Sequence, residues 1–290
     1  MTRSTSRAAT LLALPALAVA LLFLLPLAIM AGESFVRRTA DGRVSLSADQ
    51  YARFFSDSFY AGSLGLTFGT AVLVAAASIA IAYPVALVYW RAGRRARSLI
   101  LVLLLAPFYA NIVVTVLGWI VLLAPGGVVN VLLLKAGAIA APVDLLNGYG
   151  AVFVLSVHRA LPFVVLLLAN ALANIDDDVL QCARVCGASG PRVFRTIVFP
   201  LGMPGVAASA VVAFSLTAAG FVIPRLVGGA TGSRFAAVLM YQQMTATQNW
   251  PFGAAIGVLL LVASVLAVAG GLQIARRLRA GRVLGDAFLQ

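Results

Sequence analysis

The sequence predicts an all-α integral membrane protein with six transmembrane helices. Hydrophobic residues make up 62% of the chain and charged residues 10%, and the mean hydropathy is +1.03, whereas roughly half of the residues in a soluble domain are apolar. Apolar runs of about 20 residues are long enough to cross a bilayer as helices. Six such runs lie at 9–31, 63–90, 99–123, 149–172, 205–224 and 252–274. Since these runs and their connections use the whole length, we expect a single transmembrane domain over residues 1–290.

The first apolar run, 9–31, follows Arg3 and Arg7, as the apolar stretch of a signal peptide would. It is longer than the usual stretch of about 7–15 residues in such peptides, and no small-residue cleavage site follows closely. Glu33 and Phe35 come next instead. We therefore expect a retained helix.

The arginines predict the orientation of the spans. With the N-terminus in the cytoplasm, the inner connections receive the arginine clusters at 3–7, 91–97, 184–195 and 276–282. The outer connections carry arginines that acidic residues largely offset, which satisfies the positive-inside rule. Both termini are then cytoplasmic. The net charge of +12 therefore reports membrane topology, and we expect no nucleic-acid partner, because nucleic-acid binding needs basic side chains on one water-exposed face.

A further apolar stretch, 128–141, is shorter than a transmembrane helix requires. It is bounded by Gly126-Gly127 and Pro142, so we expect an interfacial or re-entrant helix on the outer side. If it crossed the membrane, the connection at 173–204 would move outside together with its arginines. The positive-inside rule argues against that.

The connection at 173–204 is a polar segment that predicts two short helices joined at a glycine. Asp176 or Asp177 can cap the first helix, and Gly187 suits the left-handed conformation that often ends a helix. Ser189 and Pro191 are typical of the start of the next helix. A rigid helix pair of this kind can transmit force that a flexible loop would absorb.

The spacing of this segment resembles the cytoplasmic "EAA" loop of binding-protein-dependent ABC importer permeases. That pattern is Glu-Ala-Ala, three residues, Gly, nine residues, Ile, one residue and Leu-Pro. The positions that correspond to it are Gln181, Cys182, Ala183, Gly187, Ile197 and Pro200. Gln181 and Cys182 depart from the usual Glu and Ala, and Phe199 replaces the Leu. The resemblance implies that these residues couple the permease to a cytoplasmic ATPase.

Further motifs, between about Ala61 and Val268, resemble the polyamine (spermidine/putrescine) branch of these permeases. They are Tyr83-Pro84-Val85-Ala86, Pro107-Phe108-Tyr109-Ala110-Asn111, Leu161-Pro162-Phe163, Gly220–Gly229 and Asn249-Trp250-Pro251. Thr115 stands where this branch often has an arginine. The resemblance implies the type I importer permease fold and a multi-pass location in the bacterial cytoplasmic (inner) membrane. It also implies import, as opposed to export, of a solute.

The chain lacks the means to hydrolyse ATP by itself. It has one lysine, Lys135, and no Gly-x-x-x-x-Gly-Lys-Ser/Thr loop to cradle phosphates. We therefore expect no enzyme activity and no cofactor bound by this chain, with ATP and Mg²⁺ on the partner ATPase. The resemblance implies three kinds of protein partner in addition to membrane lipid: an ATPase dimer, a second permease and an extracytoplasmic solute-binding protein. A metal site is not expected, because the candidate ligands His158, Cys182 and Cys186 form no complete ligand set.

An ion-coupled secondary transporter is the alternative class. Such carriers usually hold acidic residues or broken helices at mid-membrane. The nine acidic residues all lie outside the six predicted spans, although Pro107 and Pro162 would permit broken helices. This class stays open as the second interpretation.

Polar and aromatic residues within the spans predict a translocation path. Asn111, Thr115 and Trp119 recur at a spacing of four and so share a helix face, where they either line the path or hydrogen-bond a neighbouring helix. His158 and Arg159 place a charge inside the fourth span, and Phe221 lies near the end of the fifth, in the motif Gly220–Gly229. Arg159 either meets an anionic or zwitterionic solute, pairs with the second permease, or extends toward the membrane surface. The resemblance alone would instead imply a polyamine.

Overall fold

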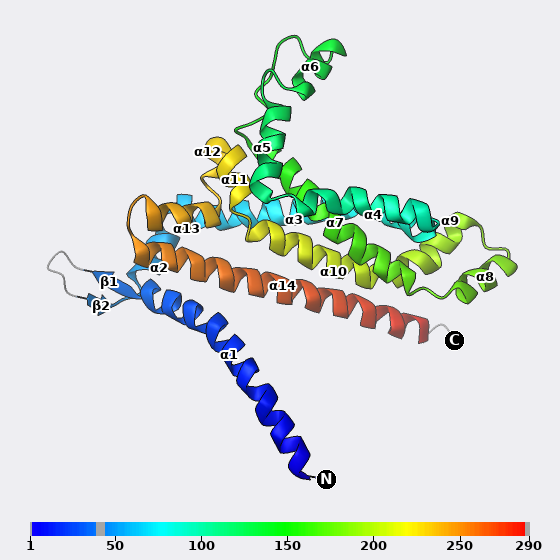
Figure 1. Cartoon of the computed structure of the whole chain (residues 1–290), viewed down its shortest axis with the longest axis horizontal. Helices are drawn as coiled ribbons and strands as arrows, with labels where there is room; N and C mark the ends of the chain where they lie inside the picture. Colours follow the sequence, from blue (N-terminus) through cyan, green and yellow to red (C-terminus); the bar gives the residue numbers. More distant parts are fainter. Residues whose placement is uncertain (1, 39–43, 288–290) are drawn as a thin grey trace. The chain divides into compact units, whose positions relative to one another are not determined.

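The computed structural model describes residues 2–38 and 44–287, which are coloured along the chain in Figure 1. The described residues form two compact units, and each is considered by itself. The first comprises the described part of Met1–Ala61 together with Leu239–Val262, and the second comprises Gly62–Val238 with the described residues from Ala263 onward. The single transmembrane domain expected over 1–290 stays a prediction.

The first unit contains one long helix, a small hairpin and a short amphipathic helix. These are α1 (Thr2–Ser34), the antiparallel strands β1 (Val36–Arg38) and β2 (Val44–Leu46), and α2 (Asp49–Ser56), joined by the end of α13 (Ala236–Thr245) and the start of α14 (Trp250–Ala287). Its core is aromatic, because Phe54 is fully buried and Tyr60 meets Phe252 edge-on with ring centroids 4.8 Å apart. The hairpin is a small departure from the all-α prediction.

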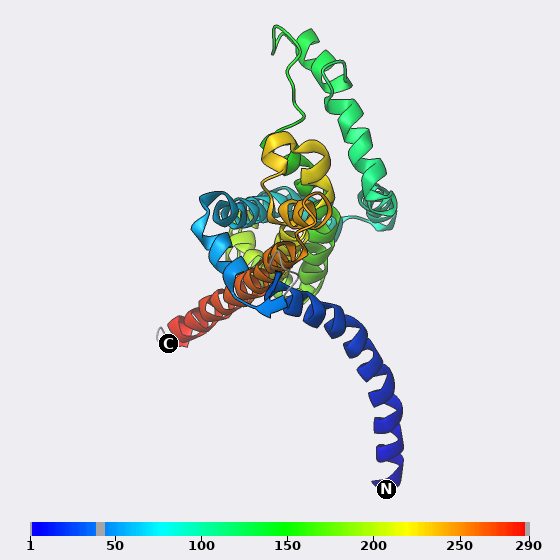
Figure 2. The same ribbon diagram turned by 90° about the vertical axis from the view of Figure 1, so that its left-hand side faces the viewer.

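The regular secondary structure in the described part of the second unit is entirely helical. Its elements are α3 (Ser58–Arg91, which begins in the first unit), α4 (Arg94–Tyr109), α5 (Ile112–Leu123), α6 (Val128–Lys135), α7 (Tyr149–Ala173), α8 (Asp177–Val185), α9 (Gly190–Val193), a π-helical turn (Phe194–Val198), α10 (Phe199–Ala218), α11 (Val222–Val227), α12 (Gly229–Gly232), the beginning of α13 and the part of α14 from Ala263 onward. Figure 2 turns the same ribbon by 90° and shows that α5 and α6 extend away from α7 and α10.

The pairing of α7 with α10 is the centre of the second unit. The two helices run side by side (Figure 1), and a Cβ added to Gly205 of α10 would lie 2.4 Å from the Cβ of Ala171 in α7. A glycine at this point allows the two backbones to approach closely, as small residues commonly do between membrane helices. The Ser209 hydroxyl of α10 also donates to the Val164 carbonyl of α7 at 3.4 Å.

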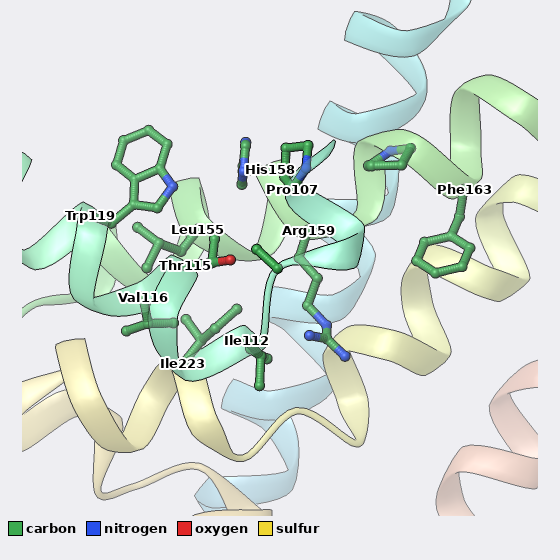
Figure 3. Close-up of a pocket in the computed structure, with 12 residues that line it drawn as sticks. Pro107, Ile112, Thr115, Val116, Trp119, Leu155, His158, Arg159, Phe163 and Ile223 are labelled. Atoms are coloured by element: carbon green, nitrogen blue, oxygen red, sulfur yellow. The ribbon is translucent and has the colours of Figure 1, made fainter. Parts of the chain in front are cut away.

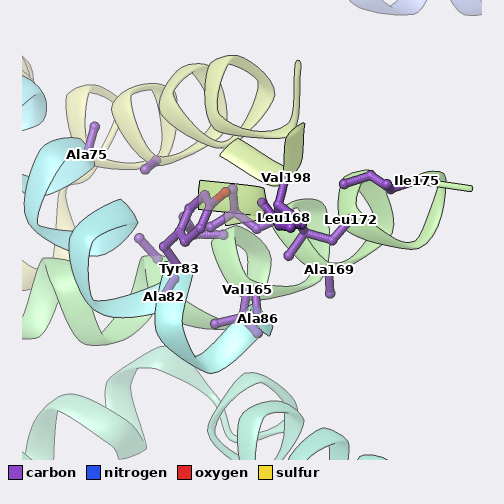
Figure 4. Packing of buried hydrophobic residues seen from close by; sticks show 14 of the residues in the cluster. Ala75, Ala82, Tyr83, Ala86, Val165, Leu168, Ala169, Leu172, Ile175 and Val198 are labelled. Atoms are coloured by element: carbon purple, nitrogen blue, oxygen red, sulfur yellow. The ribbon is translucent and has the colours of Figure 1, made fainter. Parts of the chain in front are cut away.

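Two groups of buried side chains pack along α7. The first core cluster lies toward its C-terminal end and joins α3, α8, α9, the π-helical turn and α10; Figure 4 labels part of it. Its members include Tyr83, Leu168, Leu172, Leu180, Val193 and Val198. The second core cluster lies toward the N-terminal end and joins α5 and α11; its members include Val116, Val152, Leu155, Val227 and Phe235.

Five helical runs within the described residues are long and apolar enough to span a membrane. They are Ser58–Arg91, Ile112–Lys135, Tyr149–Ala173, Gly190–Ala218 and Trp250–Gln273, and a shorter apolar helical segment is Val19–Ser34. Four of the six predicted runs, 9–31, 63–90, 149–172 and 252–274, lie within single helices.

The predicted run 99–123 is not one helix. It is divided between α4 and α5 at Ala110, whose backbone is extended, and Asn111, whose φ of −55° and ψ of 138° are not helical. The Asn111 side chain accepts a hydrogen bond from the Val113 N–H at 2.8 Å and so caps a new helix. The apolar pattern alone does not reveal this break.

Two other expected boundaries also differ from the structure. The predicted run 205–224 begins and ends about six residues later than the helix, because α10 extends from Phe199 to Ala218. The chain turns after Ala218 through hydrogen bonds such as that from the Gly220 N–H to the Thr217 carbonyl at 3.0 Å. The short helix expected over 128–141 extends only to Lys135. Gly137, with φ +69°, turns the chain out of the helix there.

Candidate functional site

The segment that resembles the EAA loop begins with a capped helix, α8. The Asp176 carboxylate accepts a hydrogen bond from the Asp178 N–H at 3.0 Å, which satisfies one of the free N–H groups of the first turn. Asp177 and Asp178 then lie in that turn, where the positive end of the helix dipole stabilises negative charge. The predicted N-terminal cap is confirmed.

Gly187 ends α8 with a backbone that favours glycine. Its φ is +75°, its N–H donates to the Arg184 carbonyl at 2.9 Å, and the Ala188 N–H donates to the Ala183 carbonyl at 3.0 Å. This pair of bonds is the Schellman arrangement, in which a left-handed residue satisfies the last carbonyls of a helix. The left-handed glycine predicted at this position is confirmed.

The helix α8 presents one side to the core and the other to solvent. Leu180 is buried in the first core cluster, and Ala183 packs against it. On the opposite side, Gln181 and Cys182 are exposed, and Val185 is 88% exposed. Together with Asp178 they occupy positions i, i+3, i+4 and i+7 and so form one face, here called the α8 outer face (Asp178, Gln181, Cys182 and Val185).

The second short helix expected after Gly187 is not separate, because α9 continues through the π-helical turn into α10. In that turn the Phe199 N–H donates to the Phe194 carbonyl, five residues back. Pro200 has no N–H, and its ring opposes a regular α-helical hydrogen bond at this point. The π-helical turn lets the helix continue past Pro200 with a different hydrogen-bond pattern. Ile197, in this turn, packs against the first core cluster, and Pro200 is half-buried.

Aromatic side chains join this turn to α3. Tyr83 meets Phe194 edge-on with ring centroids 5.9 Å apart and lies 6.0 Å from the ring of Phe199. The Tyr83 hydroxyl is buried without a hydrogen-bond partner in the described part of the chain. The segment that resembles the EAA loop therefore packs on the same core as the apolar helices.

A cavity of about 280 Å³ lies between α4, α5, α7 and α11. Figure 3 shows Trp119 toward one side, Phe163 toward the other and Arg159 between them. The Trp119 and His158 rings are in edge contact with centroids 5.5 Å apart. Thr115 also lines this cavity, so four predicted path residues meet here: Thr115, Trp119, His158 and Arg159.

A second cavity of about 420 Å³ shares Ile112, Arg159 and Ile223 with the first. It is also lined by Phe221, the fifth predicted path residue. Arg159 is exposed. It forms no hydrogen bond or ion pair with any of the described residues, 2–38 and 44–287. The guanidinium group thus lies where the two cavities adjoin.

Asn111 differs from the expected arrangement. It lines neither cavity, and its side chain caps α5. The spacing of four that grouped it with Thr115 and Trp119 assumed a helix through residue 111, whereas α5 begins at Ile112. Two residues at these sites were not predicted as site residues: Val185 on α8 and Phe163 in the first cavity. The sequence signal that would have indicated Val185 is its position four residues after Gln181, which places both on one helix face.

Residues 5–280 match the family described as the binding-protein-dependent transport system inner membrane component. The chain belongs to this family. The spermidine/putrescine transport system permease protein PotB of Escherichia coli (strain K12) is 30% identical over 240 residues, which cover 82% of this chain and 86% of PotB. The inner membrane ABC transporter permease protein YdcU of the same organism is 30% identical over 219 residues, which cover 69% of this chain and 68% of YdcU.

Solved structures show the same fold in members of ABC importers. A chain in the crystal structure of a bacterial ABC transporter involved in import of the acidic polysaccharide alginate superposes with a TM-score of 0.78 at 18% identity, covering 94% of this chain and 96% of that chain. A chain of the inward-facing MetNI methionine ABC transporter gives a TM-score of 0.58 at 18% identity, covering 75% and 94%. The binding-protein-dependent permease is thus a multi-pass membrane subunit of an ABC importer, of the polyamine type by its relatives.

Proposed function

We propose that this permease converts ATP hydrolysis on a cytoplasmic partner into solute import, with the α8 outer face as the surface that receives the ATPase. The observation that carries the proposal is the contrast between the two sides of α8. Val185 is 88% exposed, whereas Leu180, on the other side, is buried in the first core cluster. A partner that moves α8 would move the packed helices with it, because close-packed side chains transmit displacement.

The complete importer would contain several subunits. An ATPase dimer holding ATP and Mg²⁺ would contact α8 through Gln181, Cys182 and Val185 of the outer face. Ala183, on the core side, Gly187, Ile197 and Pro200 would hold that surface in place. A second permease would complete the membrane path, and an extracytoplasmic binding protein would deliver a small polar solute. One of the solved neighbours is an alginate transporter in complex with a periplasmic protein, and PotC of Escherichia coli (strain K12) is a further relative, 34% identical over 117 residues.

The membrane orientation follows from the same proposal. The α8 outer face must meet the ATPase, so residues 173–204 and both termini are cytoplasmic, in agreement with the arginine distribution and the positive-inside rule. The translocation path would then run past Thr115, Trp119, His158, Arg159 and Phe221.

Purification of the full chain from its native host in mild detergent, followed by mass spectrometry, tests the coupling surface. We expect the wild-type chain to recover an ABC ATPase and a second permease. Val185→Asp should lose most of the ATPase, because a charge would be buried at the contact without a partner. Val179→Asp is the matched control on the same helix, where Val179 is 44% exposed and lies outside the α8 outer face.

Three outcomes are informative. Loss of the ATPase in Val185→Asp alone supports the proposal, whereas equal recovery in both variants excludes the α8 outer face. Recovery of the chain alone, with solute uptake that continues without ATP, favours the ion-coupled secondary transporter instead.

A further inference from the structure

The guanidinium group of Arg159 is the most unusual feature of the second unit. Arg159 lies ten residues after the start of α7, which is about 15 Å along the helix at about 1.5 Å per residue and so near the middle of a span. An ionised side chain at that depth is costly in hydrocarbon and normally faces a partner or a water-filled cavity. Arg159 faces two cavities.

The described residues that line those cavities offer no counter-charge to Arg159. Among the described residues that line them, none is an aspartate or a glutamate, and His158 is the only other titratable side chain. The hydroxyls of Ser156, Ser215 and Thr217 supply polarity around the second cavity. An organic cation would therefore meet a like charge without a compensating carboxylate from the residues that line these cavities.

The aromatic walls fit a compact solute. Trp119 and Phe163 lie on either side of Arg159 in the first cavity (Figure 3), and Phe221 lines the second. The planar guanidinium group can hold a carboxylate or a phosphonate with two parallel hydrogen bonds. The site thus combines one fixed positive charge, several hydroxyls and apolar ring surfaces.

We propose that Arg159 binds an acidic group of the transported solute, so that the solute is a small carboxylate or phosphonate, with or without an amine, and is not a polyamine. This inference rests on the proposed function and names the substrate class of its path. Arg159 then acts as a selectivity residue at the point where the two cavities adjoin.

The test uses the complete importer, with its ATPase, second permease and binding protein, in proteoliposomes. Four radiolabelled probes are compared: citrate, 2-aminoethylphosphonate, putrescine and spermidine. We expect ATP-dependent uptake of at least one of the two acidic probes and no uptake of the two polyamines. Arg159→Gln should reduce that uptake by about tenfold or more, since a charge-assisted hydrogen bond is lost, and Arg159→Lys should retain more uptake than Arg159→Gln because it keeps the charge. Arg225→Gln, at an exposed arginine that lines neither cavity, should leave uptake unchanged.

Uptake confined to putrescine or spermidine, or no uptake of either acidic probe, overturns the anion assignment. An acidic probe taken up equally by wild type and Arg159→Gln also overturns it. If Arg159→Gln fails to assemble, the selectivity of the wild-type importer and the comparison with Arg159→Lys still decide. These failures differ from a failure of the proposed function, in which no ATPase is recovered with the chain.

Discussion

The two ends of α7 differ in what surrounds them. At the C-terminal end, Leu168 and Leu172 are buried in a cluster that includes Leu180 of α8 and Val193 of α9. Near the middle and toward the N-terminal end, the same helix borders two cavities and carries an exposed arginine. One helix therefore joins a close-packed end to a hollow one. Close packing suits the transmission of movement, and open space with polar walls suits the passage of a solute.

The largest effect expected from changing the packed end is at Gly205. Gly205→Ala should destabilise the chain by about 1–3 kcal/mol, because the new Cβ would lie 2.4 Å from that of Ala171. Gly65→Ala is the control, since a Cβ there meets no described atom within 4 Å, and it should stabilise α3 by about 0.5–1 kcal/mol. The midpoint of thermal unfolding in detergent measures both. Equal midpoints for the two variants would show that α7 and α10 are not closely packed at this point.

The next effect concerns the turn that ends α8. Gly187→Val should cost about 1–2 kcal/mol, because a side chain is strained in the left-handed conformation, and Gly187→Asn should cost less, since asparagine tolerates it better. Within the described part of the chain, a Cβ at Gly187 meets nothing within 4 Å, so the difference in stability between the two variants reports on the backbone. Hydrogen exchange of the α8 amides measures it. Identical exchange in the two variants would contradict the φ of +75°.

A matched pair of helix caps tests whether the two ends are independent. Asp176→Ala and Asn111→Ala each remove a side-chain acceptor for a backbone N–H and should each cost about 1 kcal/mol. We expect faster hydrogen exchange in α8 for the first and in α5 for the second. Faster exchange of α8 in Asn111→Ala would indicate that the cavity end and the packed end unfold as one unit.

The smallest effect is expected at Cys182, on the α8 outer face. Cys182→Ala should change stability by no more than about 0.5 kcal/mol, because the side chain is exposed, and it should leave recovery of the ATPase unchanged. Cys182→Phe should also unfold at the same temperature but recover less ATPase, since a large ring would hold the partner away. Equal recovery with Phe would mean that the ATPase does not approach Cys182.

The packed end was easier to predict from sequence than the hollow end. Asp176 and Gly187 act through hydrogen bonds within a few residues, so residue type and spacing suffice to place them. The break before α5 occurs inside a run that is apolar enough to form one span, and although Pro107 and Asn111 lie in it, the apolar pattern does not decide between a cap at Asn111 and a continuous helix. The meeting of Trp119, His158 and Arg159 depends on how α5 and α7 pack, which no local signal encodes.

The continuity of the helix from Gly190 to Ala218 has a consequence for the spacing of the loop itself. Each residue of an α-helix adds a rotation of about 100°, so deleting one residue between Gly187 and the π-helical turn would turn α10 about its axis relative to α8. Gly205 would then face away from Ala171, and the buried side of α10 would be replaced by another side. The number of residues from Gly187 to Pro200 thus fixes the rotation of α10 relative to α8 as well as the distance between them. It determines which side of α10 faces α7 when α8 presents its outer face to a partner.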